Sequence, residues 1–322
     1  QGPEPVSVEF PVNVFAVRNV DTLINTHWGL AGPASHAAIE FLGDGGAFFR
    51  VDLVGNDHIR DYANNSFPND INGVTTRQVH ADKDPNANWD TRIDKQRFEL
   101  PAAFSEELLV SVRVFDNGDF RQQRLMLSGL TVGAEASTLI EVDSGSATQS
   151  TLGYEVLTGS NAFRKAGAGE LVMDRPNSLS GITRVESGGL ILADASALRN
   201  SRIKVLDNAS ISVADSVTTS VAELTLLPAA VLNIGSGSLT VMRGLTGDQA
   251  EAELLKGRGD GFWTGTSGIT STAAAADLQA GIVRSVGWKA NPDGSVTVAY
   301  AAPGDTNLDG EVNVFDLVNV NG

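Results

Sequence analysis

A short strand-like segment recurs about every twenty residues in the second half of this 322-residue chain, and it constrains the fold more than any other feature. The four copies are GELVM (169–173), GGLIL (188–192), ASISV (209–213) and AVLNI (230–234). Their central residues are 19, 21 and 21 positions apart: Leu171, Leu190, Ile211 and Leu232. A second strand-like segment follows each of the first three copies after 14 or 15 residues, centred on Val185, Val205 and Leu226.

A fixed period near twenty residues is typical of a solenoid in which each repeat forms one coil and buries its apolar residues against the next. Alternation within each strand would direct Leu and Val inward and Thr, Ser, Glu or Arg outward. We therefore expect residues 137–243 to form a parallel β-solenoid, with Leu171, Leu190, Ile211 and Leu232 stacked as one interior ladder. The alternative is a second sandwich whose hairpins happen to be regular.

Residues 1–136 have a different character, with most of the aromatic residues of the chain. The opening VSVEFPVNVFAV alternates apolar and polar residues, and further apolar runs follow between Gly, Asn, Asp and Pro clusters. Short strands separated by such turns predict a β-sandwich, with a likeness to jelly rolls. Pro11 removes a ladder donor, so the first strand should lie at an edge or be split in two.

Residues 244–302 break the period and are expected to cap the solenoid, because an open terminal coil exposes apolar core and unpaired backbone. TGDQAEAELLKGRG is typical of a short helix, with Thr246 as N-cap and Gly257 near its end. A Trp-bearing loop and a last strand in GSVTVAYA follow, closed by a turn at NPDG. The predicted fold is thus all-β, with a sandwich, a solenoid, a cap and a terminal loop at 303–322.

That terminal loop is the stretch GDTNLDGEVNVFD (304–316), which has the spacing of a calcium site. A twelve-residue EF-hand loop places oxygen ligands at positions 1, 3, 5, 9 and 12, a carbonyl at position 7 and glycine at position 6. Counted from the first aspartate, Gly310 occupies the sixth position and the predicted Ca²⁺ ligands are Asp305, Asn307, Asp309, Glu311, Asn313 and Asp316. The alternative is an acidic turn that happens to fit this spacing.

The densest polar group elsewhere is VGNDHIRDYANNSF, which supplies Asp57, His58, Arg60 and Asp61 after a strand. Together with Trp89 these residues form a candidate ligand loop for calcium or a sugar, and Trp28 beside His27 is a further candidate contact. Such a loop is also typical of a turn held by its own side-chain hydrogen bonds. We expect no catalytic residues, since the chain has no P-loop, HExxH or GxSxG motif and no cysteine.

Two segments resemble known families. The stretch FRKAGAGELVMDRPNSLSGITRVESGGLILADASAL (163–198) resembles the autotransporter-associated β-strand repeat of secreted bacterial surface proteins, which implies parallel β-helix coils and export. GDTNLDGEVNVFDL (304–317) resembles one calcium repeat of a type I dockerin, a family that uses two such loop-helix repeats to bind cohesins. A single repeat ending in the helical stretch FDLVNV (315–320) implies calcium binding without cohesin docking.

The composition of the chain argues against several classes of binding partner. A net charge of −16, a pI near 4.6 and no basic block argue against nucleic acid and anionic membranes. No apolar run reaches the roughly 18 residues of a membrane span, and the absence of cysteine excludes disulfides. The chain begins Gln1-Gly2-Pro3, which we interpret as a processed N-terminus, with a remnant of an expression vector as the alternative.

Three classes of function fit these features. The first is a secreted, non-enzymatic surface or matrix protein that self-associates or contacts other surface proteins. The second is a carbohydrate-binding or adhesion module on a solenoid stalk, with Trp28, Trp89 and the Asp57–Asp61 loop as its site. The third is an enzyme acting on polysaccharides. The first is the prediction, and a glycan array or turnover of acidic polysaccharides would favour one of the others.

Overall fold

The computed structural model describes residues 5–316 except 30, 34, 65–68, 84, 87 and 119–122. The chain divides into two compact units, unit 1 (Gln1–Ala136) and unit 2 (Ser137–Gly322). Both are built mainly from strands, which confirms the predicted all-β class. Within the described residues no helix is both long and apolar enough to cross a membrane, as expected from the sequence.

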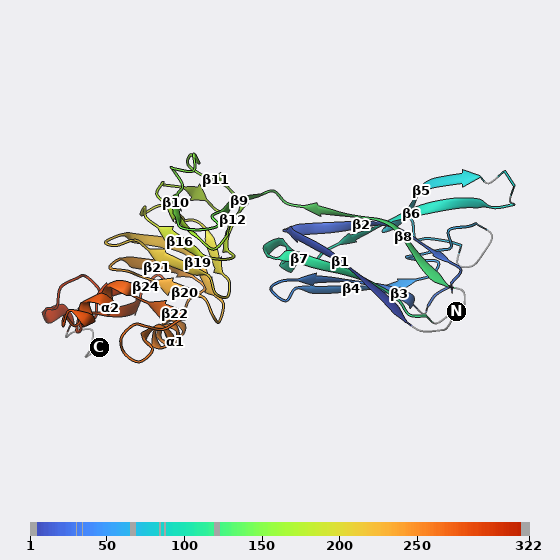
Figure 1. The fold of residues 1–322 in the computed structure, drawn as a ribbon. Helices are drawn as coiled ribbons and strands as arrows, with labels where there is room; N and C mark the ends of the chain where they lie inside the picture. Colours follow the sequence, from blue (N-terminus) through green and yellow to red (C-terminus); the bar gives the residue numbers. More distant parts are fainter. Residues whose placement is uncertain are drawn as a thin grey trace. The chain divides into compact units, whose positions relative to one another are not determined.

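Unit 1 contains two four-stranded antiparallel sheets (Figure 1). Sheet A has the order β1 (Val6–Phe15), β7 (Leu108–Asp116), β3 (Ser35–Gly43), β4 (Phe48–Val54). Sheet B has the order β5 (Thr76–Lys83), β6 (Asp90–Glu99), β2 (Val17–His27), β8 (Arg124–Ala134). A short 3-10 helix, η1 (Ala102–Glu106), lies between β6 and β7.

The core of unit 1 lies between these sheets. Val20 and Phe98 of sheet B form one buried cluster with Ile39, Phe41 and Val112 of sheet A. The rings of Phe41 and Phe98 are 5.3 Å apart between centroids, which joins the two sheets directly. Two antiparallel sheets that share one apolar layer are compatible with the predicted sandwich. The jelly-roll likeness stays a prediction.

Strand β1 lies at the edge of sheet A, as its proline predicted. It pairs with β7 through Pro11, and the register then shifts before Val14 because a bulge interrupts the ladder. Its first residues are exposed, with Val6 at 60% and Val8 at 51%. At Ala16 (φ 55°) the chain leaves the edge strand and enters β2, so the long alternating segment becomes two strands in different sheets.

Unit 2 is a parallel β-solenoid, as the repeat predicted. Sheet C is entirely parallel: β10 (Ser146–Thr148), β13 (Glu170–Met173), β16 (Gly189–Leu192), β18 (Ser210–Val213), β20 (Val231–Asn233), β22 (Gly268–Thr270). Sheet D has six parallel strands: β9 (Ser137–Glu141), β12 (Ala162–Ala166), β15 (Ile182–Val185), β17 (Arg202–Val205), β19 (Thr218–Leu226), β21 (Ser238–Arg243). Sheet D ends with antiparallel β24 (Val296–Ala301) and β23 (Ser285–Ala290), and β11 (Thr158–Gly159) pairs with β14 (Ser178–Leu179).

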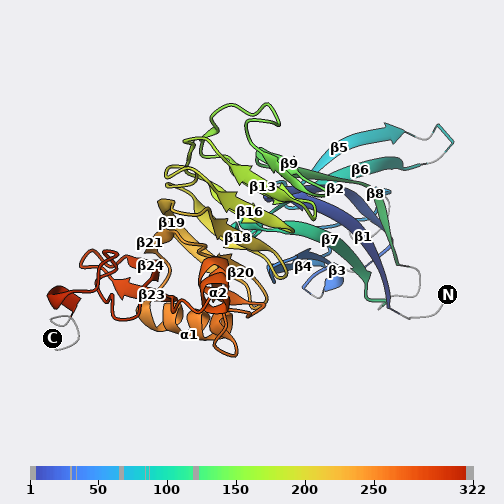
Figure 2. The same cartoon turned by 60° about the vertical axis from the view of Figure 1, so that its left-hand side comes forward.

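The interior ladder has the predicted register. Leu171 pairs with Leu190, Leu190 with Ile211, and Ile211 with Leu232, and all four side chains are fully buried. The second predicted row, Val185, Val205 and Leu226, is likewise continuous in sheet D. Figure 2 shows the strands of sheet C following one another in chain order. Each coil therefore covers the apolar residues of the one before it.

The segment predicted as a cap also contributes to the solenoid sheets. Its helix α1 (Gly247–Arg258) begins at Thr246, whose side chain accepts a bond from the Gln249 amide in a capping box. Strand β22 then extends the interior ladder, since Ile269 pairs with Leu232. A second helix, α2 (Thr272–Gln279), was not expected, although its N-cap Ser271 is a usual start signal.

Several interior positions of the solenoid are polar, where the repeat alone would place apolar residues. Lys165 is in the row with Val185, is fully buried, and donates to the carbonyls of Gly167 (2.6 Å) and Ser187 (2.8 Å). Burial lowers the pKa of this ammonium group. The buried side chains of Gln149 and Asn177 exchange two hydrogen bonds of 2.8 and 2.9 Å between neighbouring coils.

Candidate functional site

The candidate ligand loop in unit 1 enters the body of the sandwich. Strands β2 and β6 pair only over Asn19–Leu23 and Lys95–Glu99, and beyond this stretch residues 60–64 lie between them. The Thr26 amide of β2 donates to the Arg60 carbonyl (3.0 Å), and the Arg92 amide of β6 donates to the Tyr62 carbonyl (2.8 Å). These residues, 60–64, are the inserted segment, and they act as a short additional strand.

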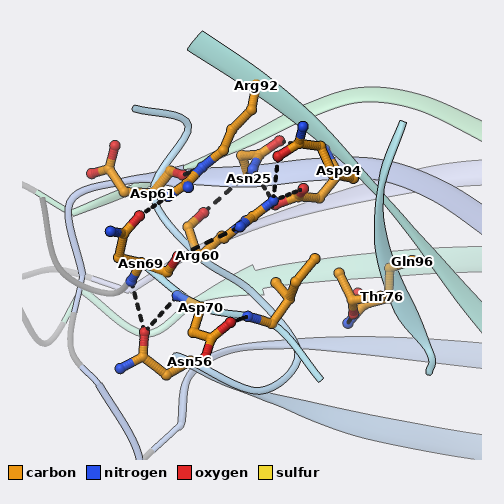
Figure 3. Close-up of polar contacts among 12 residues, drawn as sticks. Asn25, Asn56, Arg60, Asp61, Asn69, Asp70, Thr76, Arg92, Asp94 and Gln96 are labelled. Carbon is orange, nitrogen blue, oxygen red and sulfur yellow. Dashed lines mark hydrogen bonds and ion pairs between the residues drawn. The ribbon is translucent and has the colours of Figure 1, made fainter. Parts of the chain in front are cut away.

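Arg60 forms a buried, bidentate ion pair inside the sandwich (Figure 3). Its Nε and Nη2 atoms each lie 2.7 Å from one carboxylate oxygen of Asp94, which is fully buried. Asn25 binds the same residue twice: its side-chain amide donates to the carboxylate (2.9 Å), and its oxygen accepts from the Asp94 amide (3.0 Å). Nη2 of Arg60 also donates to Gln78 (2.9 Å). Such complete pairing offsets the cost of burying both charges.

Asp61 and Arg92 complete the buried network without pairing to each other through their side chains. The Asp61 carboxylate accepts from the backbone amides of Trp28 and Ala63, and its carbonyl accepts from Arg92 Nε (3.0 Å). Arg92 also reaches the carbonyl of Ala63 and the side chain of Asn69. Burial, with the Arg60 guanidinium as the next cause, lowers the pKa of Arg92. Both residues hold the inserted segment in place.

Asp57, His58 and Trp89 lie outside this network. The Asp57 carboxylate accepts from the Asn72 side chain (3.0 Å) and is 3.6 Å from Nδ1 of His58, which accepts from the Val54 amide (3.3 Å). Trp89 is 37% exposed just before β6. The structure therefore brings Arg60 and Asp61 into one buried cluster, whereas the other three predicted residues are more accessible. This geometry favours a structural role for Arg60 and Asp61.

His58 also lines a cavity of about 240 Å³ in unit 1, whose apolar wall includes Phe49, Val51 and Phe98. Two acids near His58 are engaged by other side chains: Asp57 accepts from Asn72 (3.0 Å), and Glu99, which also lines the cavity, pairs with Arg97 (2.6 Å). The cavity can hold a small apolar group beside the His58 ring.

The C-terminal stretch, in which a calcium loop was predicted, curls back on itself through hydrogen bonds from backbone amides to two aspartates. The Asp305 carboxylate accepts from the amides of Asp309 (3.2 Å) and Gly310 (3.0 Å), so the first ligand position faces the fifth and sixth. The Asp316 carboxylate accepts from the amides of Thr306 (2.7 Å) and Asn313 (2.8 Å), which closes the loop. Gly310 has φ 91°, the left-handed conformation that favours glycine at the turn.

The predicted ligands are of the type that a hard cation such as Ca²⁺ prefers, since each of them supplies an oxygen atom. The side chains nevertheless bond one another and the backbone: Asn307 Nδ2 donates to Asp309 (2.8 Å). Within the described residues no three His, Asp or Glu side chains gather as a metal cluster. Hydrogen bonds from backbone amides, the Asn313 amide above all, stabilise the charged carboxylate of Asp316 and lower its pKa. The rest of the predicted FDLVNV helix, residues 317–320, lies outside the described residues.

The loop is anchored on the solenoid cap by two contacts with β23. Lys289 Nζ donates to the Asn307 carbonyl (2.5 Å), and the Leu308 side chain lies over Gly287, where an added Cβ would come within 2.8 Å. Order in the loop is therefore coupled to the last strand pair of sheet D.

Comparisons of the chain with protein-family models, curated proteins and solved structures found no match. The autotransporter-associated and dockerin resemblances therefore stay predictions, while the solenoid that the first implied is present in unit 2. The sequence singled out Arg60 and Asp61 but not their partners, because these come from three other segments: Asn25 of β2, Gln78 of β5, and Arg92 and Asp94 of β6.

Proposed function

We propose that this protein is a non-enzymatic structural protein of the bacterial cell surface or extracellular matrix, with unit 2 as a rigid stalk. The observation that carries the proposal is the unbroken interior ladder from Leu171 to Ile269, in which each side chain is buried by the next coil. Stacked coils make a stiff element whose surface needs no catalytic cleft. Electron microscopy of the purified protein, with and without calcium, tests this role.

We further propose that the terminal loop binds one Ca²⁺ ion through Asp305, Asn307, Asp309, Asn313, Asp316 and the carbonyl of Glu311. The support is the curl of the loop, in which the carboxylates of Asp305 and Asp316 both accept hydrogen bonds from backbone amides of the loop. A bound cation would neutralise acidic groups and fix the loop against β23 through Lys289 and Leu308. Calcium should therefore stiffen the C-terminal end of unit 2.

Self-association is proposed through the edge strand β1. Val6 and Val8 of this strand are exposed. Glu9 is the one charged residue in the part of the strand that precedes the bulge. An exposed apolar edge is a template for pairing with a strand of another copy. Light scattering at high protein concentration should detect assembly that a Val6→Lys, Val8→Lys variant loses. A monomeric wild type in the presence of calcium would exclude it.

A second candidate function is carbohydrate binding by unit 1. The observation that favours it is the exposed indole of Trp28 (42% exposed), whose backbone is fixed by the buried Asp61 carboxylate. An exposed aromatic ring on a rigid support is suited to stacking on a sugar. A glycan array distinguishes this function from the purely structural one.

A further inference from the structure

Trp28 adopts a backbone conformation that a bulky side chain rarely takes. Its φ is 62°, in the left-handed region, and its side chain is 42% exposed. This conformation is stabilised by a hydrogen bond from the Trp28 N–H to the buried Asp61 carboxylate. Strained residues persist only where surrounding contacts determine them, and they concentrate at ligand sites. A buried carboxylate thus fixes the direction of an exposed indole.

The His27 ring lies beside this indole, and the Tyr62 ring lies beside His27. The His27 ring meets Trp28 edge-on, with centroids 6.2 Å apart and planes at 88°. The Tyr62 ring is 5.7 Å from His27 and comes from the inserted segment, which the Tyr62 amide ties to Thr26 (2.9 Å). Histidine and tyrosine add hydrogen-bonding atoms beside the apolar face of Trp28. The group combines residues 35 positions apart in the sequence on one rigid support.

A basic residue adjoins these rings. Arg124 of β8 is the cross-strand partner of His27, and directly paired residues of an antiparallel ladder share one face of the sheet. The nearby carboxylates Asp61 and Asp116 are engaged by backbone amides, Asp116 by those of Gly118 (3.0 Å) and Leu125 (3.2 Å). The Arg124 guanidinium donates through Nη1 to the Gln123 carbonyl, and Arg124 pairs with His27, the residue before the exposed Trp28.

We propose that Trp28, His27, Tyr62 and Arg124 form a binding site for a sugar that carries a carboxylate. The indole face of Trp28 stacks on the sugar ring, and the Arg124 guanidinium pairs with the carboxylate, an anion that its planar donors match. His27 and Tyr62 donate to sugar hydroxyls. This inference rests on the second candidate function and specifies its site and its ligand class.

The test is calorimetric titration of the whole chain with an oligogalacturonate, compared with a neutral galacto-oligosaccharide of equal length. Trp28→Ala should weaken oligogalacturonate binding about tenfold or more, as expected for truncation of a central aromatic contact. Arg124→Gln should weaken binding of the acidic sugar and abolish its preference over the neutral one. Phe48→Ala, which removes an exposed ring (58%) from sheet A, is the matched control and should bind as wild type. Thermal unfolding verifies that each variant is folded.

The outcomes separate the site from the function. Equal binding of the two oligosaccharides would overturn the acidic ligand class. Folded Trp28→Ala and Arg124→Gln variants that bind oligogalacturonate as tightly as wild type would overturn this site and leave carbohydrate binding elsewhere on the chain. Absence of binding to either sugar, with a negative glycan array, would overturn both this site and the candidate function.

Discussion

Arg60 and Asp94 are 34 residues apart in the sequence and form two 2.7 Å bonds inside unit 1. Asp94 lies on the same face of β6 as Phe98, so the strand passes from apolar core to a buried ion pair within four residues. Asn25 donates a third hydrogen bond to the Asp94 carboxylate and accepts one from the Asp94 amide. The pair joins the inserted segment to sheet B.

Breaking this pair is the first prediction. Arg60→Met should lower the free energy of unfolding of unit 1 by about 3–5 kcal/mol, because it leaves the Asp94 carboxylate buried without its cation. Adding Asp94→Leu should restore part of the loss. Urea denaturation followed by tryptophan fluorescence measures both. Arg97→Met on the same strand is the control, since Arg97 is 47% exposed and its ion pairs should contribute about 0–1 kcal/mol.

The second prediction concerns the interior ladder. Leu190→Ala should cost about 2–5 kcal/mol, because the cavity lies between fully buried Leu171 and Ile211 of the neighbouring coils. Ser212→Ala on the outward row of the adjacent strand should change stability by less than about 0.5 kcal/mol. Chemical denaturation monitored by circular dichroism compares them, and equal effects of the two changes would contradict the ladder.

Gly257 offers a third test, because the usual rule for helices is reversed there. Alanine normally stabilises a helix interior by about 1 kcal/mol relative to glycine. At Gly257, however, an added Cβ would lie 1.9 Å from the Ile269 carbonyl oxygen of β22. Gly257→Ala should therefore destabilise unit 2 by roughly 1–3 kcal/mol. Glu251→Ala, exposed on the same helix, should be nearly neutral, and a more stable Gly257→Ala protein would show that α1 does not pack closely on β22.

Calcium binding is the fourth prediction. Calorimetry of the whole chain should detect one Ca²⁺ site that Asp305→Ala and Asp309→Ala each abolish, since both remove a predicted ligand. Asp293→Ala is the matched control, because its carboxylate binds Ser295 in the turn before β24. A heat of binding that survives both loop variants would place the ion elsewhere.

Acid sensitivity of the solenoid gives a fifth prediction. The Ser150 hydroxyl, bonded to Asp174 on the next coil, lowers the pKa of Asp174 below its ordinary value of 3.8. This contribution is fully present above pH 3.8 and is lost as the pH falls through the folded pKa. Denaturation from pH 7 to pH 3 should show a stability gap between wild type and Ser150→Ala that narrows below pH 4 or so. A constant gap would contradict the linkage.

Local patterns predicted the ladder because solenoid coils meet their sequence neighbours. Leu190 and Ile211 pair because they occupy the same position in adjacent coils. The register between coils can therefore be read from the period of about twenty residues. The same holds for Thr246, whose capping box is complete within four residues. The spacing of Asp305 to Asp316 predicts a calcium loop, which stays a prediction.

Long-range packing decided the rest. Nothing near Arg60 indicates that residues 60–64 will separate β2 from β6, because its partner Asp94 and Asn25 come from two other strands. Lys165 occupies an interior position only because three carbonyls of surrounding turns meet its ammonium group. The sequence by itself therefore determined the repeat, its inward faces and the local turns. The tertiary structure alone decided which buried charges are paired, because such partners are distant in the chain and a buried charge is stable only when they meet.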